Sequence, residues 1–482
     1  MAEIVDKPKK KKKKKKKKAA EAVVEVAPEE LVPDLEPDLE ERIVEAIESG
    51  DAPRVRDLTE PLHHTDVADL LERLNDDDRA KLVDIIRPEF EAEILIDLDD
   101  TVRDDVVDLL GIEEVAAAVV ELESDDAVQV MEELDAADQQ QVLEAIPDDE
   151  RVLIEEGLAY PDDSAGRLMQ REVVRVPTFW SVGECIDFLR RNADQEESSL
   201  PERFYNLFVV DPKHRPVGTV ALDTLLRTRR PVPLTDIMDP EMKLVPVTAD
   251  QEDVAFLFRQ RDLASAPVVD ESGRLVGAIT IDDIVDVIDE EYEEDLLHMG
   301  GVAEDDLYDA AIDTTRARFS WLVVNLITAI VASIVIGLFD ATIDQIVALA
   351  ILMPIVASMG GNAGTQTLTV VVRALAMKEL TTTNAARLLG KELMVGVFNG
   401  VIFAVLAGGV AWAWFGSPIL GGVIGLAMVV NMIVAGLAGT AIPLALDRMG
   451  VDPAIASSVF LTTVTDVVGF FVFLGLAAIV LL

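Results

Sequence analysis

FSWLVVNLITAIVASIVIGLF, residues 319–339, is a run of 21 residues without a charged side chain. A helix rises about 1.5 Å per residue, so a helix of this length crosses a hydrocarbon core of about 30 Å. Further apolar runs follow at 345–372, 393–446 and 453–480. The run 393–446 is long enough for two helices, separated at Gly416-Ser417-Pro418. Two tryptophans lie beside this break, and tryptophan is enriched at membrane interfaces. The sequence therefore predicts an all-α domain of five membrane spans over residues 315–482.

The charges between the spans orient this domain, because basic residues favour the cytosolic side. Basic residues precede the first span and fill the loop between the second and third spans: Arg316, Arg318, Arg373, Lys378, Arg387 and Lys391. The loop after the first span carries only Asp340 and Asp344. We therefore expect a multi-pass protein of the cell membrane with a cytosolic N-terminus and an extracellular C-terminus.

The rest of the chain is strongly acidic. The net charge is -47, whereas residues 315–482 hold seven basic and seven acidic side chains, so the excess lies in residues 1–314. Such a surface repels nucleic acid and attracts cations. Arginine outnumbers lysine outside the N-terminal tail, as in salt-adapted proteins, which is the alternative explanation for any single surface carboxylate. The lysine run Lys9–Lys18 predicts a disordered tail over residues 1–30.

Cysteine and histidine usage excludes several kinds of site. Cys185 is the only cysteine, which excludes an intrachain disulfide and a zinc-cysteine site. The four histidines lie outside the predicted spans and show no ligand spacing beyond the adjacent His63 and His64. No nucleophile and base stand in a catalytic pattern, so we do not expect an enzyme.

Apolar residues recur every 24 positions between about residues 62 and 158. One such series is Leu71, Leu95, Val119 and Leu143. Each repeat holds two short amphipathic stretches with an Asp- or Pro-rich break, and stacked units of this kind bury a continuous core. We predict an acidic α-helical solenoid over residues 31–160.

A second duplication follows in a β-rich stretch. LMQREVVRVP (168–177) matches IMDPEMKLVP (237–246), and FVVDPKHRPVGTVALDTLL (208–226) matches PVVDESGRLVGAITIDDIV (267–285). The strand, turn, strand, helix ending of both copies resembles the cystathionine-β-synthase (CBS) domain. The resemblance implies tandem α/β domains over 165–230 and 231–289.

In CBS domains, a Thr or Ser followed three residues later by an Asp, after the last strand, can bind a nucleotide ribose. The second copy matches this pattern with Thr280 and Asp283, whereas the first copy has Ala221 and Thr224. At most one nucleotide site, for example for ATP, is therefore expected. An acidic connecting segment, residues 283–313, then leads to the first span, and its apolar residues keep helical spacing up to Gly300-Gly301.

Asp466 is an acidic residue inside the last span. A charge at the centre of a membrane helix costs roughly 3 kcal/mol on insertion scales, so such residues face a partner or a cavity. The spans offer no basic partner, and we expect no second acidic residue in them. Thr462, Thr463 and Gly469 share the helix face of Asp466. We interpret Asp466 as a cation site, with a protonated Asp bonded to a neighbouring helix as the alternative.

Span two contains Pro354 and then GGNAGTQ (360–366). We expect this run to weaken the helix, and irregular backbone at membrane depth survives where it lines water or is buried in protein. The run is thus a candidate pore lining, with a glycine packing face as the alternative. In the next spans, Gly396 with Gly400 and Gly421 with Gly425 predict close helix approach.

The order of these parts resembles the MgtE family of magnesium channels and transporters. The membrane motifs that carry the resemblance are MPIVASMGGNAGTQ (353–366), VVRALA (371–376), GVDPA (450–454) and TTVTDVVGF (462–470). It covers nearly all of the chain beyond the tail and implies a homodimer with the pore between two membrane domains. In such a pore Asp466 holds a hydrated Mg²⁺ with the carbonyl of Thr462 nearby. The candidate lining residues are Gly361, Asn362, Gly364, Gln366 and Thr463.

The physical chemistry of Mg²⁺ agrees with that site, because this ion gives up its waters reluctantly and binds through few carboxylates. One Asp per subunit, doubled by a two-fold axis, supplies two negative charges without removing those waters.

The resemblance also implies that the cytosolic domains sense Mg²⁺, which bridges their acidic faces and holds the pore shut. The matching acids are Asp283, Asp286, Glu291, Glu294 and Asp295 on the connecting segment, and Asp125 and Asp126 on the solenoid. Gln129 stands where another solenoid acid is expected, which is a departure from the family pattern. Asp283 is also the candidate ribose ligand.

The resemblance thus predicts a Mg²⁺-selective channel that imports Mg²⁺ and closes when cytosolic Mg²⁺ is plentiful. One alternative is a secondary transporter coupled to Na⁺ or H⁺, against which the absence of a visible inverted repeat argues. Another is a membrane-tethered sensor of nucleotide or metal.

Overall fold

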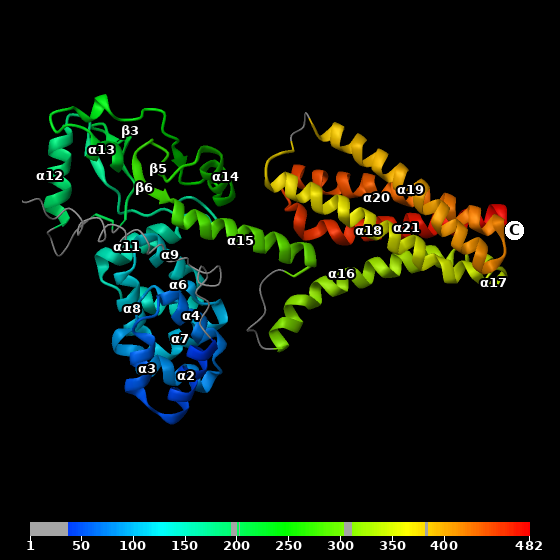
Figure 1. Cartoon of the computed structure of the whole chain (residues 1–482), viewed down its shortest axis with the longest axis horizontal. Helices are drawn as coiled ribbons and strands as arrows, with labels where there is room; N and C mark the ends of the chain where they lie inside the picture. Colours follow the sequence, from blue (N-terminus) through cyan, green and yellow to red (C-terminus); the bar gives the residue numbers. More distant parts are fainter. Residues whose placement is uncertain (1–36, 194–199, 202, 303–310, 381–383) are drawn as a thin grey trace, which may run out of the picture. The chain divides into compact units, whose positions relative to one another are not determined.

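The computed structural model of the chain describes residues 37–193, 200–201, 203–302, 311–380 and 384–482 (Figure 1). The chain divides into two units, Met1–Leu158 and Ala159–Leu482, and each is described by itself. The predicted lysine-rich tail lies outside the described residues, as do residues 303–310 of the connecting segment.

The first unit is built from short helices. These are α2 (Pro37–Ser49), α3 (Ala52–Thr59), α4 (His64–Arg73), α5 (Asp76–Ile86), α6 (Ile94–Asp97), α7 (Asp100–Leu110), α8 (Ile112–Glu121), α9 (Ser124–Glu133), α10 (Ala136–Ala145) and α11 (Asp148–Leu158), with a 3₁₀ turn at Arg87–Glu89. The helices α5, α7, α9 and α11 begin 24 residues apart. The predicted helical repeat is therefore confirmed.

Polar side chains fix where these helices begin. Asn75, Asp99 and Asp135 each stand just before a helix and accept hydrogen bonds from backbone N–H groups of its first turn. Two buried arginines 24 residues apart, Arg79 and Arg103, donate to carbonyl oxygens at the end of the preceding helix. The acidic breaks in the sequence are thus helix caps, and the repeat extends to the polar contacts.

The second unit begins with two small sheets of the same topology. The first contains β1 (Arg175–Pro177), β2 (Asn206–Val210) and β3 (Pro216–Ala221), and the second contains β4 (Val245–Pro246), β5 (Ser265–Val269) and β6 (Leu275–Thr280). In each sheet the first strand is parallel to the second, and the second is antiparallel to the third. Strands β5 and β6 lie 59 residues after β2 and β3, which confirms the duplication.

The two copies also exchange a pairing. Gln170 bridges to Ala278 of the second sheet, and its equivalent Asp239 bridges to Thr219 of the first. The accompanying helices are α12 (Val182–Ala193), α13 (Leu222–Arg227) and α14 (Gln251–Arg261), with a 3₁₀ turn at Leu234–Asp236. This reciprocal pairing joins the two copies into one CBS pair.

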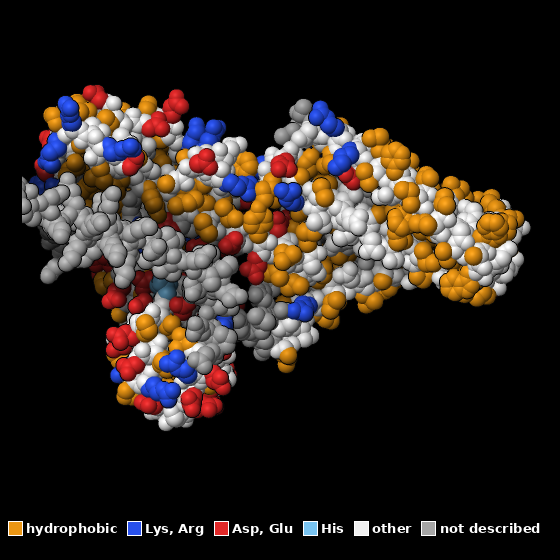
Figure 2. Space-filling view, viewed as in Figure 1, with side chains coloured by type: hydrophobic (Ala, Val, Ile, Leu, Met, Phe, Trp, Pro, Cys, Tyr) orange, Lys and Arg blue, Asp and Glu red, His pale blue; other side chains and the backbone are white. Residues whose placement is uncertain are grey.

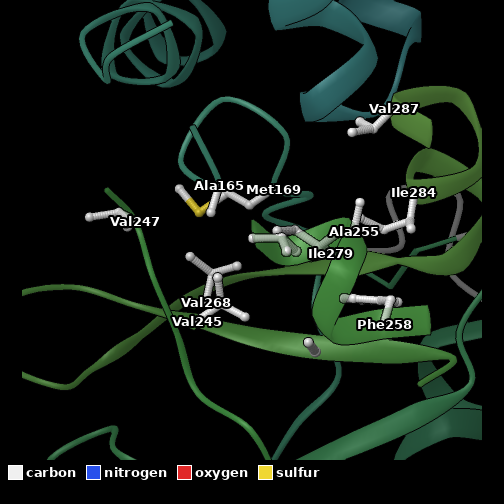
Figure 3. Close-up of a cluster of buried hydrophobic side chains, with 12 residues drawn as sticks. Ala165, Met169, Val245, Val247, Ala255, Phe258, Val268, Ile279, Ile284 and Val287 are labelled. Atoms are coloured by element: carbon white, nitrogen blue, oxygen red, sulfur yellow. The ribbon is translucent and has the colours of Figure 1, made fainter. Parts of the chain in front are cut away.

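Helix α15 (Ile281–Gly300) follows β6, the last strand of the second copy, without a loop. Ile284 and Val287 of this helix are buried with Phe258 of α14 and Ile279 of β6 (Figure 3). The helix ends at Gly301, whose φ of +78° suits glycine. The first turns of α15 therefore belong to the core of the second copy.

The membrane domain consists of long apolar helices packed side by side (Figure 1). They are α16 (Ala311–Gly337), α18 (Ala348–Ala376), α19 (Ala385–Phe415), α20 (Pro418–Arg448) and α21 (Pro453–Val480), and a short α17 (Asp340–Gln345) follows α16. Among the described residues, these five long helices have the length and composition to cross a membrane, as predicted. Figure 2 shows hydrophobic side chains over the bundle and charged ones at its end near α15.

Glycines bring α19 and α20 into close contact. A Cβ at Gly396 or Gly400 would meet the backbone of α20, and a Cβ at Gly421 or Gly425 would meet the backbone of α19, in each case within about 3.1 Å. The predicted close approach is therefore confirmed.

Helix α18 differs from its expectation. It runs without interruption from Ala348 to Ala376, through Pro354 and the glycine-rich run 360–366. The prediction of irregular backbone is wrong, because packing against neighbouring helices outweighs the low helix propensity of glycine. An unbroken helix also satisfies its own backbone groups inside a membrane.

Candidate metal centres

Asp466 lies near the middle of α21 and is partly exposed. None of the residues that the structure describes hydrogen-bonds or ion-pairs with its carboxylate. The nearby hydroxyls bond within their own helix: Thr462 and Thr463 donate to the Val459 carbonyl, and Thr465 donates to the Thr462 carbonyl at 3.0 Å. The Asp466 carboxylate is thus left free for a ligand.

Contacts between α18 and α21 fix the depth of Asp466 in the bundle. A Cβ at Gly360 of α18 or at Gly469 of α21 would meet the same asparagine of α20. A Cβ at Gly364 would lie 2.8 Å from the Leu461 side chain. The two helices therefore run antiparallel, and Asp466 lies at the depth of the glycine-rich run.

The candidate lining residues of α18 fall on two faces. Gly364 is buried against α21, so it belongs to a packing face. Asn362 and Gln366 are exposed, and a Cβ at the half-buried Gly361 would meet no atom within 4 Å. Thr463 of α21 is half-buried. The open face of α18 thus carries Gly361, Asn362 and Gln366 at the depth of Asp466.

A second acidic side chain lies inside a predicted span. Glu392 falls within α19 and is 8% exposed. Its Oε2 accepts a hydrogen bond from Thr367 Oγ1 of α18 at 3.0 Å, and Lys391 Nζ lies 3.6 Å from its Oε1. The expectation of no second acid in the spans is therefore wrong. The helix begins at Ala385, before the uncharged run that marks it in the sequence.

A cavity of about 490 Å³, which we call the acidic pocket, lies between the second CBS copy, α15 and the ends of α18, α20 and α21. Eight carboxyl side chains line it: Asp163, Asp250, Glu252, Glu291, Glu294, Asp295, Asp447 and Asp452. Only Arg259 and Lys378 oppose them. A cluster with this charge attracts divalent cations.

Two carboxyls of the acidic pocket have raised pKa values, because burial disfavours their charged form. Burial raises the pKa of the Glu291 carboxyl to about 7, and the charges of Glu252 and Glu294 add to the rise. Burial and the charge of Asp452 raise the pKa of Asp295 to about 6. A bound cation would relieve this penalty by balancing the carboxylates.

Three of the five predicted sensing residues of the connecting segment, Glu291, Glu294 and Asp295, thus line the acidic pocket. Asp283 caps α15 instead, accepting hydrogen bonds from Thr280 N at 3.1 Å and Thr280 Oγ1 at 2.8 Å. The two predicted nucleotide ligands therefore bond to each other. Asp286 is exposed and does not line the pocket.

The end of α15 and the neighbouring helix α14 contact the bundle at several points. His298 Nδ1 lies 3.1 Å from Asp452 Oδ2 at the start of α21. Met299 packs against the cluster that contains Leu368 and Leu461. Lys378, which follows α18, pairs with Asp253 of α14. The connecting helix thus touches the two helices that carry the candidate ion path.

Sequence reasoning missed five acids of the pocket: Asp163, Asp250, Glu252, Asp447 and Asp452. They come from separate segments that only the fold brings together. Asp452 was within reach, because it stands in the GVDPA motif (450–454).

The two predicted solenoid ligands lie in the first unit. Asp125 is buried at the start of α9, and its Oδ1 accepts a hydrogen bond from Asp126 N at 3.1 Å. Gln129 donates to Glu133 within the same helix. The role of these residues as Mg²⁺ ligands stays a prediction.

In the part of the chain that the structure describes, no group of three or more His, Cys, Asp or Glu side chains is arranged to hold a metal ion.

Three family models match the chain. The MgtE intracellular N domain matches residues 62–163, the CBS domain matches 234–290, and the MgtE divalent cation transporter domain matches 353–476.

Whole-chain comparison finds relatives named magnesium transporter MgtE. The relative from Thermus thermophilus is 33% identical over 443 residues, which are 91% of this chain and 97% of the relative. The relative from Bacillus subtilis is 29% identical over 437 residues, or 90% and 96%. Among solved structures, the cytosolic domain of the Mg²⁺ channel MgtE in complex with ATP is 31% identical. The matched region covers 52% of this chain and 99% of the chain in the solved structure, with a TM-score of 0.47.

Proposed function

Because the chain belongs to the MgtE family of magnesium transporters, we propose that this membrane protein carries Mg²⁺ through a gated pore beside Asp466. Mg²⁺ transport is the activity of the family. Passive conduction, the pore site, the gate and the dimer are our proposals. Since the relatives are transporters, no catalytic reaction is assigned to the chain.

The observation that carries the pore proposal is the free carboxylate of Asp466 at the depth of the open face of α18. An unpaired charge at this depth is costly unless water or an ion balances it. A hydrated Mg²⁺ meets both needs, because its outer waters donate hydrogen bonds to a carboxylate. The Asn362 and Gln366 side chains and the Thr462 carbonyl offer further polar atoms to those waters.

A single carboxylate neutralises half of the charge of Mg²⁺. A homodimer with its two-fold axis along the pore would bring two copies of Asp466 to one ion. The molecular mass of the purified protein in detergent tests this part of the proposal. A mass of one chain would contradict it.

The acidic pocket is the proposed gate. When cytosolic Mg²⁺ fills it, the carboxylates of α15 and of the bundle ends are held together, and α15 stays docked across α18 and α21. Without Mg²⁺ the same charges repel, and the docked state loses stability. Asp283 and Asp286 in the second unit, and Asp125 and Asp126 in the first, are proposed as further Mg²⁺ ligands.

Two finer points complete the proposal. The acidic pocket lies where α18 ends and α21 begins, which supports a cytosolic location for that end and an extracellular C-terminus. ATP would bind at the second CBS copy, where it must displace the hydrogen bond between Thr280 and Asp283.

The test of the pore site is Mg²⁺ uptake into liposomes that contain the purified protein. The isosteric Asp466→Asn variant is expected to lose at least tenfold in uptake rate, because it removes the charge without changing the shape. Asp344→Asn, at an exposed acid beyond the first span, is the control and keeps the wild-type rate. Undiminished uptake by Asp466→Asn would rule out the pore site, and uptake that requires a Na⁺ or H⁺ gradient would favour coupled transport.

The test of the gate uses two double variants. Glu291→Gln with Asp295→Asn changes the acidic pocket, while Asp289→Asn with Glu293→Gln changes exposed acids of α15 outside it. Only the first pair is expected to keep conducting when Mg²⁺ on the cytosolic side is high. Equal inhibition of both pairs would show that the pocket is not the gate.

A further inference from the structure

Three buried polar side chains link different helices of the membrane bundle. They are Thr367 of α18, Glu392 of α19 and Asn431 of α20, which are 7%, 8% and 0% exposed. By contrast, Thr440, which is also buried, donates to the Gly436 carbonyl of its own helix. A hydrogen bond between two helices in apolar surroundings fixes their relative rotation, because turning either helix leaves a buried polar group unpaired.

Asn431 holds α20 against both α18 and α21. Its Nδ2 donates to the Val356 carbonyl of α18 at 2.9 Å. A Cβ at Gly360 would lie 2.2 Å from this Nδ2, and a Cβ at Gly469 would lie 2.8 Å from it. The amide therefore fills a gap that exists only because both neighbouring positions are glycine.

The Asn431 amide is only partly paired. Asn431 Oδ1 is buried and has no hydrogen-bond partner among the described residues. A buried unpaired acceptor lowers stability, and an apolar side chain would avoid that cost. A residue that breaks a packing rule in this way is expected where its position serves function.

Glu392 and Thr367 form the second link. The Thr367 hydroxyl donates to Glu392 Oε2 at 3.0 Å in a buried position. Glycines of α20 again make the room: a Cβ at Gly436 would lie 2.9 Å from the Glu392 carbonyl oxygen, and a Cβ at Gly439 would lie 3.0 Å from Thr367 Cβ. This link joins α18 to α19 next to α20.

The two links bracket the open face of α18. Val356 and Thr367 are about three helical turns apart, and Gly361, Asn362 and Gln366 lie between them. Resting on the proposed function of Asp466 and this face, we propose that Asn431 and Glu392 are positioning residues for the ion path. They set the rotation of α18, and so the distance between its open face and the hydrated ion at Asp466.

This role predicts a particular defect. One residue of helix rotation is about 100°, so even part of such a turn moves Asn362 and Gln366 away from the ion. Loss of a link should therefore raise the Mg²⁺ concentration for half-maximal uptake and weaken discrimination against Ca²⁺. The maximal rate should fall much less, because the Asp466 carboxylate remains.

The experiment compares Thr367→Val with Thr440→Val, in which the same hydroxyl is removed from buried threonines. Only the first change breaks a link between helices. In liposome uptake, Thr367→Val is expected to raise the half-saturating Mg²⁺ concentration about three- to tenfold, while Thr440→Val stays within twofold. Thr367→Ser keeps the hydroxyl donor and Glu392→Gln keeps an oxygen acceptor, so each of these variants should behave like the wild type. Asn431→Ala, with thermal unfolding as a check on folding, tests the other link.

Each outcome decides between the two proposals. A wild-type concentration dependence of Thr367→Val, or equal shifts in both valine variants, would overturn the positioning role and leave the pore site intact. Undiminished uptake by Asp466→Asn in the same assay would overturn the pore site and, with it, the positioning role. Added loss in a Thr367→Val, Glu392→Leu double variant beyond Glu392→Leu alone would show that the pair does not act as one link.

Discussion

Adjacent glycines of α18 have different surroundings, which leads to a sharp contrast between two substitutions. A Cβ at Gly360 would lie 2.2 Å from the Asn431 amide, whereas a Cβ at Gly361 meets nothing within 4 Å. Gly360→Ala must push the amide or the helix aside, at an expected cost of roughly 1–3 kcal/mol. Gly361→Ala should be neutral or stabilising, because alanine favours a helix by about 1 kcal/mol over glycine. Thermal unfolding in detergent measures both effects.

The two variants are matched, since they introduce the same methyl group one residue apart in the same helix. Equal unfolding temperatures for both would mean that Asn431 moves without cost. The interhelical contact of its amide would then not hold α18 in place.

At the scale of single residues, the sequence reveals only what is unusual along the chain. Asp466 is visible because a charge interrupts an apolar run. Asn431 and Glu392 are not, because their partners lie 75 and 25 residues away on another helix. Glu392 also sits at the edge of its apolar run, where a charge looks ordinary.

At the scale of elements, α15 carries two carboxyls whose raised pKa values make its docking depend on pH. The carboxyls of Glu291 and Asp295 ordinarily titrate at 4.5 and 3.8, and in the acidic pocket their pKa values rise to about 7 and about 6. The folded state therefore binds protons that the unfolded chain releases. Their contribution to stability is present below about pH 4 and is lost as the pH rises through 6 and 7.

Without Mg²⁺, the docked α15 is thus expected to be less stable at pH 8 than at pH 6. Hydrogen exchange of the α15 amides in the full chain measures this difference. Saturating Mg²⁺ should remove most of this difference, because the bound cation balances the carboxylate charges that protons neutralise at low pH. Glu291→Gln should shrink the difference even without Mg²⁺. If the protection of the α15 amides against exchange is the same at pH 6 and pH 8, the assignment is contradicted.

Periodic elements were predictable and contact-dependent ones were not. The 24-residue helical repeat and the 59-residue offset of the strands are written in the spacing of local patterns, and the structure follows both. The glycine-rich run of α18 was misjudged, because intrinsic propensity favoured a break while contacts with Asn431 and Leu461 keep the helix intact. The acidic pocket was only partly predictable, since its walls come from distant segments such as Asp163 and Asp452.

At the scale of the whole molecule, two explanations compete for the acidic charge. A net charge of -47 destabilises any folded chain by self-repulsion, and salt of any kind relieves that repulsion. Salt adaptation and metal sensing would both make the protein more stable when ions are added. They differ in whether the kind of cation and the place of binding matter.

MgCl₂ and NaCl at equal ionic strength separate these explanations. General screening raises the unfolding temperature with either salt, whereas a Mg²⁺ site adds a further increment. One site at a Mg²⁺ concentration of 100 times its Kd contributes about 2.7 kcal/mol. We expect MgCl₂ to stabilise the full chain beyond NaCl, and Glu291→Gln with Asp295→Asn to remove that excess without changing the NaCl response. If the two salts stabilise equally, or if the excess survives in the double variant, the carboxylates of α15 serve solubility in salt and the gate must lie elsewhere.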